Sequence, residues 1–542
     1  MHAVLRTPEL RHAIFKDLTR YDLIALAIAC KEFSEDSLGM LWSYCFDIRD
    51  ILDLLPDDKK TISRVNRKRV VVCSDLTPQD ISRIYFYTAF IRKLDVDFKD
   101  HRASESCMQQ IVSLAAASGQ ELFPNLRKLR YHGPTHFAPC LTFLLAPTLT
   151  KLTLIIDTSD ERWESQRAGK PVYGATELSA LFDLKARDSP RIASLHLRIH
   201  TNHPWPLDEL LDGWDSLEDL CIEASINEMV LSSVFRLPRL HSVVLDGTEW
   251  FMVDEATKWL SLDDLDVLPV ASPILTHISL RLSSLAEAAR LLAALTVLDL
   301  AKLYIEDVGK FPALQAFFQL LGKRLEPAIL RELVSKLALD VTMTRRILGD
   351  SSDLPAEQSV NLHLLRPLLS FSNLARFILP VTSNIEITLD DDDVDSLARA
   401  WPRLEVLEVY TVRRPSSAPP PACTINALLS FARHCPLLRL LGMELDATVV
   451  RALDPSVVPV QRSLWQLQVH HSPIESPADV AAFLSTLFPN LESIEVPDQA
   501  PSHRENPSRK IMQCRSLRLL PENAVKCANL PVEPDRGARP AA

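Results

Sequence analysis

Residues 124–131 read PNLRKLRY, and this short pattern decides the fold. Leu126, Leu129 and Tyr131 occupy the apolar slots of an L-x-x-L-x-L motif, and Pro124 lies two residues before the first slot. If other apolar residues are allowed in the slots, the motif recurs fourteen times, with first slots at Ile91, Leu126, Leu149, Ile192, Leu217, Leu240, Leu275, Leu295, Val334, Leu374, Leu404, Leu438, Leu464 and Leu491. Successive units are 20 to 43 residues apart, a spacing typical of leucine-rich repeats with insertions of variable length.

Prolines support this register. Eight of the fourteen units have proline two residues before the first slot, against about one expected by chance from 37 prolines in 542 residues: Pro124, Pro147, Pro190, Pro238, Pro273, Pro402, Pro436 and Pro489. Because proline cannot continue a helix, each unit is expected to end a helix at the proline and then to begin a strand.

The repeat predicts an α/β fold. In a strand the three slots point to one side, where stacked units form a continuous core. We therefore expect an irregular leucine-rich-repeat solenoid over residues 89–520, a horseshoe of about fourteen units with parallel strands on its concave face. The units that begin at Leu295 and Val334 fit the pattern least well.

Residues between the slots face the concave side, which such arrays use for binding. Early units carry mainly basic side chains there and later units mainly acidic ones, which suits a partner protein with a charged, asymmetric surface. The residues predicted to bind a target are Lys128, Arg130, His132, Lys151, His196, Arg198, Glu223 and Tyr410. The alternative is that these are ordinary solvated strand residues.

Residues 1–50 have a different, helical pattern. Leu10, Ile14 and Leu18 recur every four residues, Asp22 is placed to cap a second helix, and Ser34 a third. Three short helices cannot cover all of their apolar residues, which include Phe15, Ile24, Ile28, Phe33 and Trp42. The surplus predicts either a docking face for a partner or packing against the repeats that follow.

The helical segment resembles an F-box, particularly the variant that opens many basidiomycete (fungal) F-box proteins. The resemblance rests on the order Pro8, Leu10, Ile14, Leu18, Asp22-Leu23, Leu26, Cys30-Lys31, Ser34, Leu38 and Leu41-Trp42. It implies that the helices bind the Skp adaptor and, through it, the cullin and RING subunits of a ubiquitin ligase. The adaptor contacts that it implies are Pro8, Leu10, Ile14, Leu18, Leu23, Leu26, Leu41 and Trp42. Phe33 departs from the family, which usually has tryptophan there.

The remaining segments have weaker patterns. Residues 51–88 are expected to link the helices to the repeats, and their basic run Arg64, Arg67, Lys68 and Arg69 suits a nuclear-import patch or a solvated turn. Residues 411–422 predict a mobile Pro/Ser-rich loop, and 521–542 a disordered tail.

Composition excludes several classes of protein. A net charge of −11 disfavours a nucleic-acid binder, and the apolar runs are too short for a membrane span. Ten scattered cysteines without a C-x-x-C pair are typical of reduced thiols in a cytoplasmic or nuclear protein.

Catalytic and metal motifs are missing from the sequence. It contains no G-x-S-x-G, G-x-x-x-x-G-K-[ST] or G-x-G-x-x-G pattern. His196, His200 and His203 do not converge if His196 lies on a strand, and Asp390 to Asp393 more plausibly cap a helix than bind calcium. The sequence thus predicts a protein that is not an enzyme and needs no cofactor or metal: a ligase adaptor, or alternatively a leucine-rich-repeat scaffold without a ligase role.

Overall fold

The computed structural model describes residues 7–65, 68–73, 75–97, 102–133, 141, 144–157, 191–200, 207–224, 226, 228–246, 274–282, 285–295, 300–307, 312–337, 359–381, 385–411, 419–451, 453 and 458–495. The predicted tail at 521–542, most of the predicted loop at 411–422 and the end of the predicted array after Glu495 lie outside these residues. The chain divides into two compact units, Met1–Leu275 and Thr276–Ala542.

Unit 1 begins with helices and continues as a parallel sheet. Its described elements, in chain order, are α1 (Pro8–Phe15), α2 (Arg20–Ala29), α3 (Lys31–Trp42), β1 (Tyr44–Cys45), α4 (Ile48–Leu52), β2 (Lys60–Val65), β3 (Lys68–Cys73), α5 (Ser82–Thr88), β4 (Lys93–Asp97), α6 (Arg102–Ser118), β5 (Lys128–Gly133), β6 (Lys151–Asp157), β7 (Ser194–His200), α10 (Leu207–Leu211), β8 (Asp219–Glu223), α11 (Glu228–Phe235) and β9 (Ser242–Asp246). Strands β1, β4, β5, β6, β7, β8 and β9 pair in that order, all in parallel.

Unit 2 repeats the same strand and helix alternation. Its described elements are β10 (His277–Leu282), α12 (Leu285–Ala294), β11 (Lys302–Asp307), α13 (Pro312–Arg324), β12 (Glu332–Leu337), β13 (Ser359–Val360), α15 (Leu362–Leu365), η3 (Arg366–Leu368), β14 (Arg376–Val381), β15 (Glu386–Ile387), α16 (Asp391–Ala400), β16 (Val406–Thr411), η4 (Ile425–Ala427), α17 (Leu428–His434), β17 (Leu440–Met443), β18 (Gln466–Gln468), α18 (Pro477–Leu487) and β19 (Ser493–Glu495). Strands β10, β11, β12, β14, β16, β17, β18 and β19 pair in order and in parallel.

The core of each unit is a ladder of apolar slots. In unit 1 the second slots stack in register and are at most 2% exposed: Leu94, Leu129, Leu152, Leu195, Leu220 and Val243. In unit 2 the corresponding ladder is Ile278, Leu303, Leu333, Phe377, Leu407, Leu441, Leu467 and Ile494. This arrangement confirms the α/β leucine-rich-repeat fold, preceded by the N-terminal helices.

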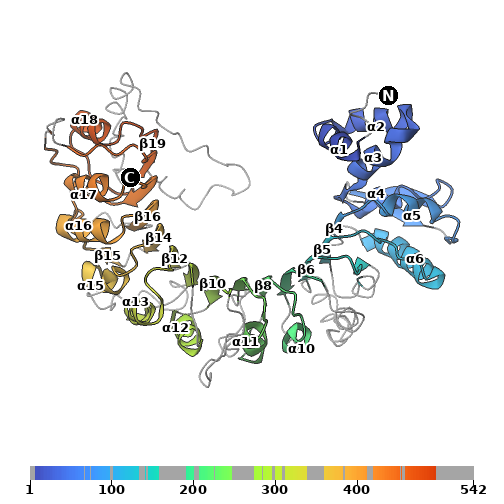
Figure 1. The fold of residues 1–542 in the computed structure, drawn as a ribbon, viewed down its shortest axis with the longest axis horizontal. Helices are drawn as coiled ribbons and strands as arrows, with labels where there is room; N and C mark the ends of the chain where they lie inside the picture. The colour runs from blue at the N-terminus through green and yellow to red at the C-terminus, as the bar shows by residue number, and fades with distance from the viewer. Residues whose placement is uncertain are drawn as a thin grey trace, which may run out of the picture. The chain divides into compact units, whose positions relative to one another are not determined.

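Helices cover one face of the sheet in each unit. In unit 1, α10 and α11 lie on one side of the strands, and in unit 2, α12, α13 and α16 to α18 do so (Figure 1). The residues between the apolar slots lie on the opposite side, which we call the open face. The helix that each proline was expected to end is present at α16, α17 and α18, which end just before Pro402, Pro436 and Pro489.

Twelve of the fourteen predicted registers are confirmed, because their first slots are buried and precede a strand of the ladder. The registers at Leu295 and Val334 are wrong. Leu295 directly follows α12, and the slots of β11 are Leu300, Leu303 and Ile305. Leu295 and Leu300 are both buried and lie only five residues apart, so the apolar pattern also fits a unit that begins too early, at Leu295.

At β12 the buried slots are Leu330 and Leu333, and the polar Ser335 stands in register with the third slot of β11, Ile305. Because Ser335 breaks the apolar pattern, the sequence motif fits better from Val334, four residues after Leu330, and there predicts the wrong register. The sheet also contains a strand for which the sequence has no motif, since β1 pairs in parallel with β4.

The described residues of the segment 51–88, predicted to link the helices to the repeats, form secondary structure of their own. After α4 they form the antiparallel hairpin β2–β3, in which Arg64 pairs with Arg69, and then α5. Ile51, Leu52 and Leu55 are buried, so this segment contributes to the core of unit 1.

The described cysteines differ in state. Cys30, Cys45, Cys221, Cys423 and Cys435 are free thiols, as expected, but Cys107 is disulfide-bonded, so the expectation of reduced thiols is wrong for that residue. No described helix is long and apolar enough to cross a membrane.

Candidate protein-binding site

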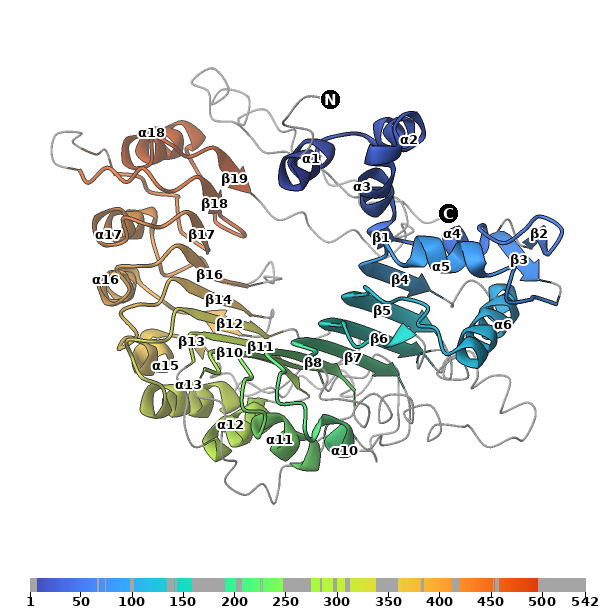
Figure 2. The ribbon, with the colours of Figure 1, turned by 45° about the vertical axis from the view of Figure 1, so that its right-hand side comes forward.

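Two parts of unit 1 offer a surface for other proteins: the three N-terminal helices and the open face of the sheet. The helices lead directly into the sheet, because α3 ends at Trp42 and β1 begins at Tyr44 (Figure 2). The backbone amides of Arg92 and Lys93 donate to the Ser43 carbonyl, and the Tyr44 hydroxyl donates to Asp95 at 2.6 Å. The helices are thus fastened to the first strands at several points.

Local sequence determines where these helices begin. Pro8 is the first residue of α1, where its missing N–H costs no hydrogen bond. The second helix is capped by Thr19, whose hydroxyl accepts from the Asp22 amide while the Asp22 carboxylate accepts from Thr19. Asp22 is therefore the third residue of the helix and the second partner in a capping box. The prediction that Asp22 itself caps the helix is wrong by three residues. Likewise α3 begins at Lys31, so Ser34 lies inside the helix.

The capping box also fixes the charge of Asp22. Hydrogen bonds from Thr19, first through its side chain and then through its backbone, lower the pKa of the Asp22 carboxyl. An ionised carboxylate in the first turn of a helix also interacts favourably with the helix dipole.

A small core joins the helices. Phe15 is buried and meets Phe33 edge-on, with ring centroids 5.6 Å apart, and Arg11 forms an ion pair with Asp36 at 2.8 Å. These contacts tie α1 to α3. Phe33 therefore packs within the helices, against Phe15.

The apolar surplus that the sequence predicts is divided between two places. Trp42 packs on Tyr87 of α5, with ring centroids 4.8 Å apart, so this part is covered by the unit's own chain. The outer face of α2 stays exposed: Tyr21 is 85%, Ile24 40% and Ile28 82% exposed. Leu10 and Ile14, four residues apart on α1, are 45% and 42% exposed.

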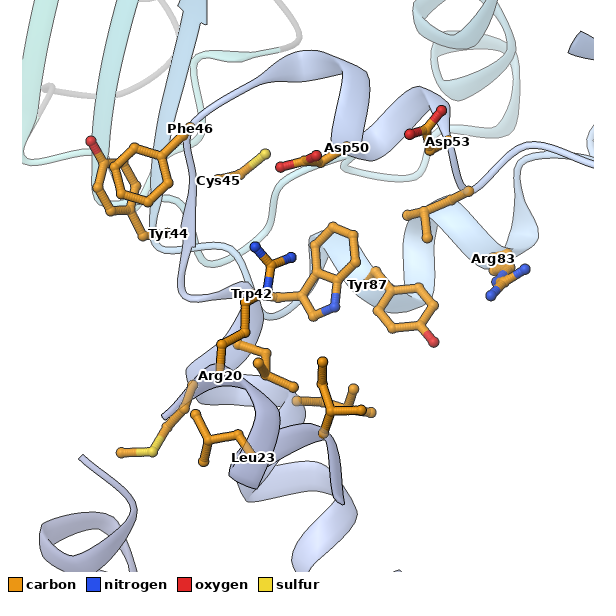
Figure 3. A pocket seen from close by; sticks show the side chains of 15 residues that line it. Arg20, Leu23, Trp42, Tyr44, Cys45, Phe46, Asp50, Asp53, Arg83 and Tyr87 are labelled. Carbon is orange, nitrogen blue, oxygen red and sulfur yellow. The ribbon is translucent and has the colours of Figure 1, made fainter. Parts of the chain in front are cut away.

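A cavity of about 580 Å³ lies where the helices meet the sheet (Figure 3). Helical residues supply one wall and the segment after Trp42 supplies the other; the lining residues are Arg20, Leu23, Ile24, Leu38, Met40, Leu41, Trp42, Tyr44, Cys45, Phe46, Asp50, Asp53, Leu54, Arg83 and Tyr87. In Figure 3 the indole of Trp42 lies beside the ring of Tyr87. Burial, and next the charge of Asp47, raise the pKa of Asp50, whereas Arg20 opposes this shift.

The eight residues implied as adaptor contacts are thus not equivalent. Pro8, Leu10 and Ile14 are exposed on α1, and Leu18 and Leu26 are half-buried. Leu23 is only 7% exposed and lines the cavity, as do Leu41 and Trp42. Exposed residues absent from that set, Tyr21, Ile24 and Ile28, extend the apolar surface along α2.

The open face of unit 1 carries most of the residues predicted to bind a target. Lys93, Lys128 and Lys151 align in one row across β4, β5 and β6. Like charges directly opposite one another repel, so this row favours an anionic partner segment. His132 Nδ1 lies 3.2 Å from Asp97, and Arg130 is exposed beside it.

Further along the same face, basic and acidic side chains pair with one another. His196 Nε2 lies 2.7 Å from Glu223 Oε1, and Arg198 Nε lies 3.0 Å from Glu223 Oε2. The structure therefore brings three of the predicted residues together. Cys221 completes this group and was not predicted, although it holds the same position in its repeat as His196 in the preceding one. An alignment of the repeats by slot would have shown this.

The remaining predicted residue, Tyr410, lies in unit 2. Its half-buried ring stacks on His470, with centroids 3.7 Å and planes 13° apart. Glu408, Gly442, Gln468 and Glu495 align in a row next to it on the open face of that unit.

Comparisons with known proteins add little beyond the fold. No protein-family model matches the chain, and no curated protein matches it. A solved structure of the Rad7 and Elc1 complex in yeast aligns at 13% identity, covering 92% of this chain and 91% of that chain, with a TM-score of 0.31. The leucine-rich repeat-containing protein LegL7 from Legionella pneumophila aligns at 14% identity, covering 66% of this chain and 86% of that one, with a TM-score of 0.25. Both TM-scores are low, so the fold assignment rests on the strand register and burial described above.

Proposed function

We propose that this chain is the substrate-recognition adaptor of a ubiquitin ligase of the Skp–cullin–F-box type. Helices α1 to α3 would dock on Skp, and the open face would hold a protein target. The observation that carries the proposal is the apolar surface that α1 and α2 leave exposed, since Leu10, Ile14, Tyr21, Ile24 and Ile28 are all at least 40% exposed. Exposed apolar surface of this kind is typical of protein–protein interfaces.

Helical spacing places these residues in two stripes. Leu10 and Ile14 are four residues apart on α1, and Tyr21, Ile24 and Ile28 follow the i, i+3, i+7 pattern of one face of α2. The opposite face of α2 turns inward at Leu23. A short helix that is apolar on two opposite faces is suited to lie between the core of its own chain and a partner protein.

The proposed role on the open face is positional. The chain would hold the target near a ubiquitin carrier and raise the local concentration of its lysines, without bond chemistry of its own. The row of Lys93, Lys128 and Lys151 supports a target that presents an acidic segment.

A binding measurement with purified Skp and the full chain tests the proposal. The double variant Leu10→Gln/Ile28→Gln removes one apolar residue from each stripe and is expected to weaken binding at least ~100-fold, since each central apolar contact is worth about 2 kcal/mol. Both positions are exposed, so the melting temperature should not change.

Met229→Gln is the matched control, because Met229 is 63% exposed and lies on α11, outside helices α1 to α3. It should leave Skp binding intact. Failure of the wild-type chain to bind Skp at all would overturn the ligase proposal.

A second candidate is a leucine-rich-repeat scaffold without a ligase role. It is favoured by the packing of Trp42 on Tyr87 and by the continuity of α3 with β1, which fit helices that seal the end of a repeat array. In that case Ile28 and its neighbours would have no partner, and the Gln double variant would behave as wild type in every interaction.

A further inference from the structure

Two neighbouring strands on the open face of unit 1 bring together three side chains that can bind a metal. His196 lies on β7, opposite Cys221 of β8, and Glu223 lies two residues further along β8. One ligand atom from each, an imidazole nitrogen, a thiol sulfur and a carboxylate oxygen, all lie within 4.8 Å of one another. All three residues are half-buried, so the group is partly shielded from solvent yet reachable.

Hydrogen bonds already orient the carboxylate. Glu223 Oε1 lies 2.7 Å from His196 Nε2, and Glu223 Oε2 lies 3.0 Å from Arg198 Nε. A partner such as Arg198, which does not itself bind the metal, holds a ligand of a metal site in place. Glu223 Oε2 would stay paired with Arg198, while Glu223 Oε1, next to His196, would bind the metal.

The charges of the group are suited to a divalent cation. Asp246 stands opposite Glu223 in the register between β8 and β9, so a second acidic residue lies on the neighbouring strand. A divalent cation bound here would be held by the Cys221 thiolate and the Glu223 carboxylate, whose two negative charges match its own.

We propose that His196, Cys221 and Glu223 form a zinc site on the open face. Zinc takes this mixed set of nitrogen, sulfur and oxygen donors, and its bond lengths of about 2.0–2.3 Å require ligand atoms roughly 3.5 Å apart. Side-chain shifts of about 1 Å would bring the three atoms to that spacing. Three protein ligands leave a fourth position for water or for a side chain of a bound protein.

This site is independent of the proposed ligase role. It involves none of the residues of α1 to α3, so either proposal can fail without the other. The sequence predicts no metal site, because histidine spacing along a single strand does not include the ligands of the neighbouring strand.

Titration of the full-length, chelator-treated chain with Co²⁺ tests the proposal. A thiolate bound to Co²⁺ gives a charge-transfer absorption, and we expect it to saturate near one equivalent and to be displaced by Zn²⁺. Cys221→Ser, which is nearly isosteric, should abolish the band. His196→Ala and Glu223→Gln should each weaken binding by more than the ~10–100-fold that loss of an outer partner costs.

Two controls separate the site from general effects. Cys435→Ser removes a buried free thiol of unit 2, and His132→Ala removes the histidine of the His132–Asp97 pair on the same face. Both should bind Co²⁺ as wild type does. No thiolate band in the wild-type protein, or a band that persists in Cys221→Ser, would overturn the proposal, and the wild-type measurement decides even if a variant does not fold.

Discussion

His470 combines three unfavourable features in one residue. Its φ of 42° lies in the left-handed region, its side chain is only 8% exposed, and its Nε2 has no hydrogen-bond partner among the described residues. Burial, and then the charge of His471, lower the pKa of His470 to about 4. Strain of this kind persists only where surrounding packing holds it, here through the stack on Tyr410.

The lowered pKa predicts a pH-dependent stability. Unfolded His470 titrates near 6.5 and folded His470 near 4, so between these values the unfolded chain binds an additional proton. The contribution of neutral His470 to stability is therefore complete above pH 6.5 and declines as the pH falls toward 4. By pH 5 the loss should be about 2 kcal/mol.

His470→Asn should remove this part of the pH dependence and also relieve the backbone, since asparagine tolerates positive φ better than histidine. Denaturant midpoints at pH 7.5 and pH 5 would measure the change. His363→Asn, at an exposed position on α15, is the control and should keep the wild-type difference. An unchanged pH dependence in His470→Asn would contradict the assignment.

At the scale of elements, helices pack so closely in unit 2 that one position excludes a side chain. A Cβ at Gly322 of α13 would lie 2.8 Å from the Pro367 carbonyl oxygen of η3. At Gly39 of α3 the nearest atom would be a Phe90 ring carbon at 3.7 Å, an ordinary contact. Two helical glycines of the same chain thus meet opposite environments.

Alanine substitutions are expected to separate them. In a helix alanine is favoured over glycine by about 1 kcal/mol, so Gly39→Ala should raise stability by roughly 0.5–1 kcal/mol. Gly322→Ala should instead lower it by about 1–3 kcal/mol, because backbone must shift to admit the methyl group. Chemical denaturation of both variants measures the sign, and a stabilised Gly322→Ala would show that α13 and η3 do not pack as described.

The elements also show how far local pattern extends. Asp390 is the N-cap of α16 and forms a capping box with Asp393, so the prediction that these carboxylates begin a helix is confirmed. Thr19, by contrast, caps α2 where Asp22 was predicted. Both residue types suit a cap, and only the backbone geometry distinguishes the cap from the third residue of the helix.

At the scale of the molecule, the N-terminal helices contribute to the core of unit 1 as well as to its surface. The cavity is lined by Leu38, Leu41 and Trp42 from α3 and by Leu54 and Tyr87 from the segment that follows. Removal of the helices would expose Leu54 and Tyr87 to solvent.

Deletion of residues 1–43 should therefore lower the unfolding temperature and increase binding of a hydrophobic dye, whereas Leu10→Gln/Ile28→Gln should do neither. Thermal unfolding with dye fluorescence measures both proteins in parallel. A deletion that melts as wild type does would mean that the helices add nothing to the core of unit 1.

The sequence by itself determined the repeat, twelve of its fourteen registers and the helical start of the chain, because slots, prolines and capping residues act within a few neighbouring positions. The tertiary structure alone decided which apolar residues of the helices stay exposed: Trp42 is covered by Tyr87, whereas Ile28 is not. It also decided that His196 meets Cys221 and Glu223, since that contact depends on the register between two strands whose residues lie about 25 positions apart in the chain. No local pattern carries such a register.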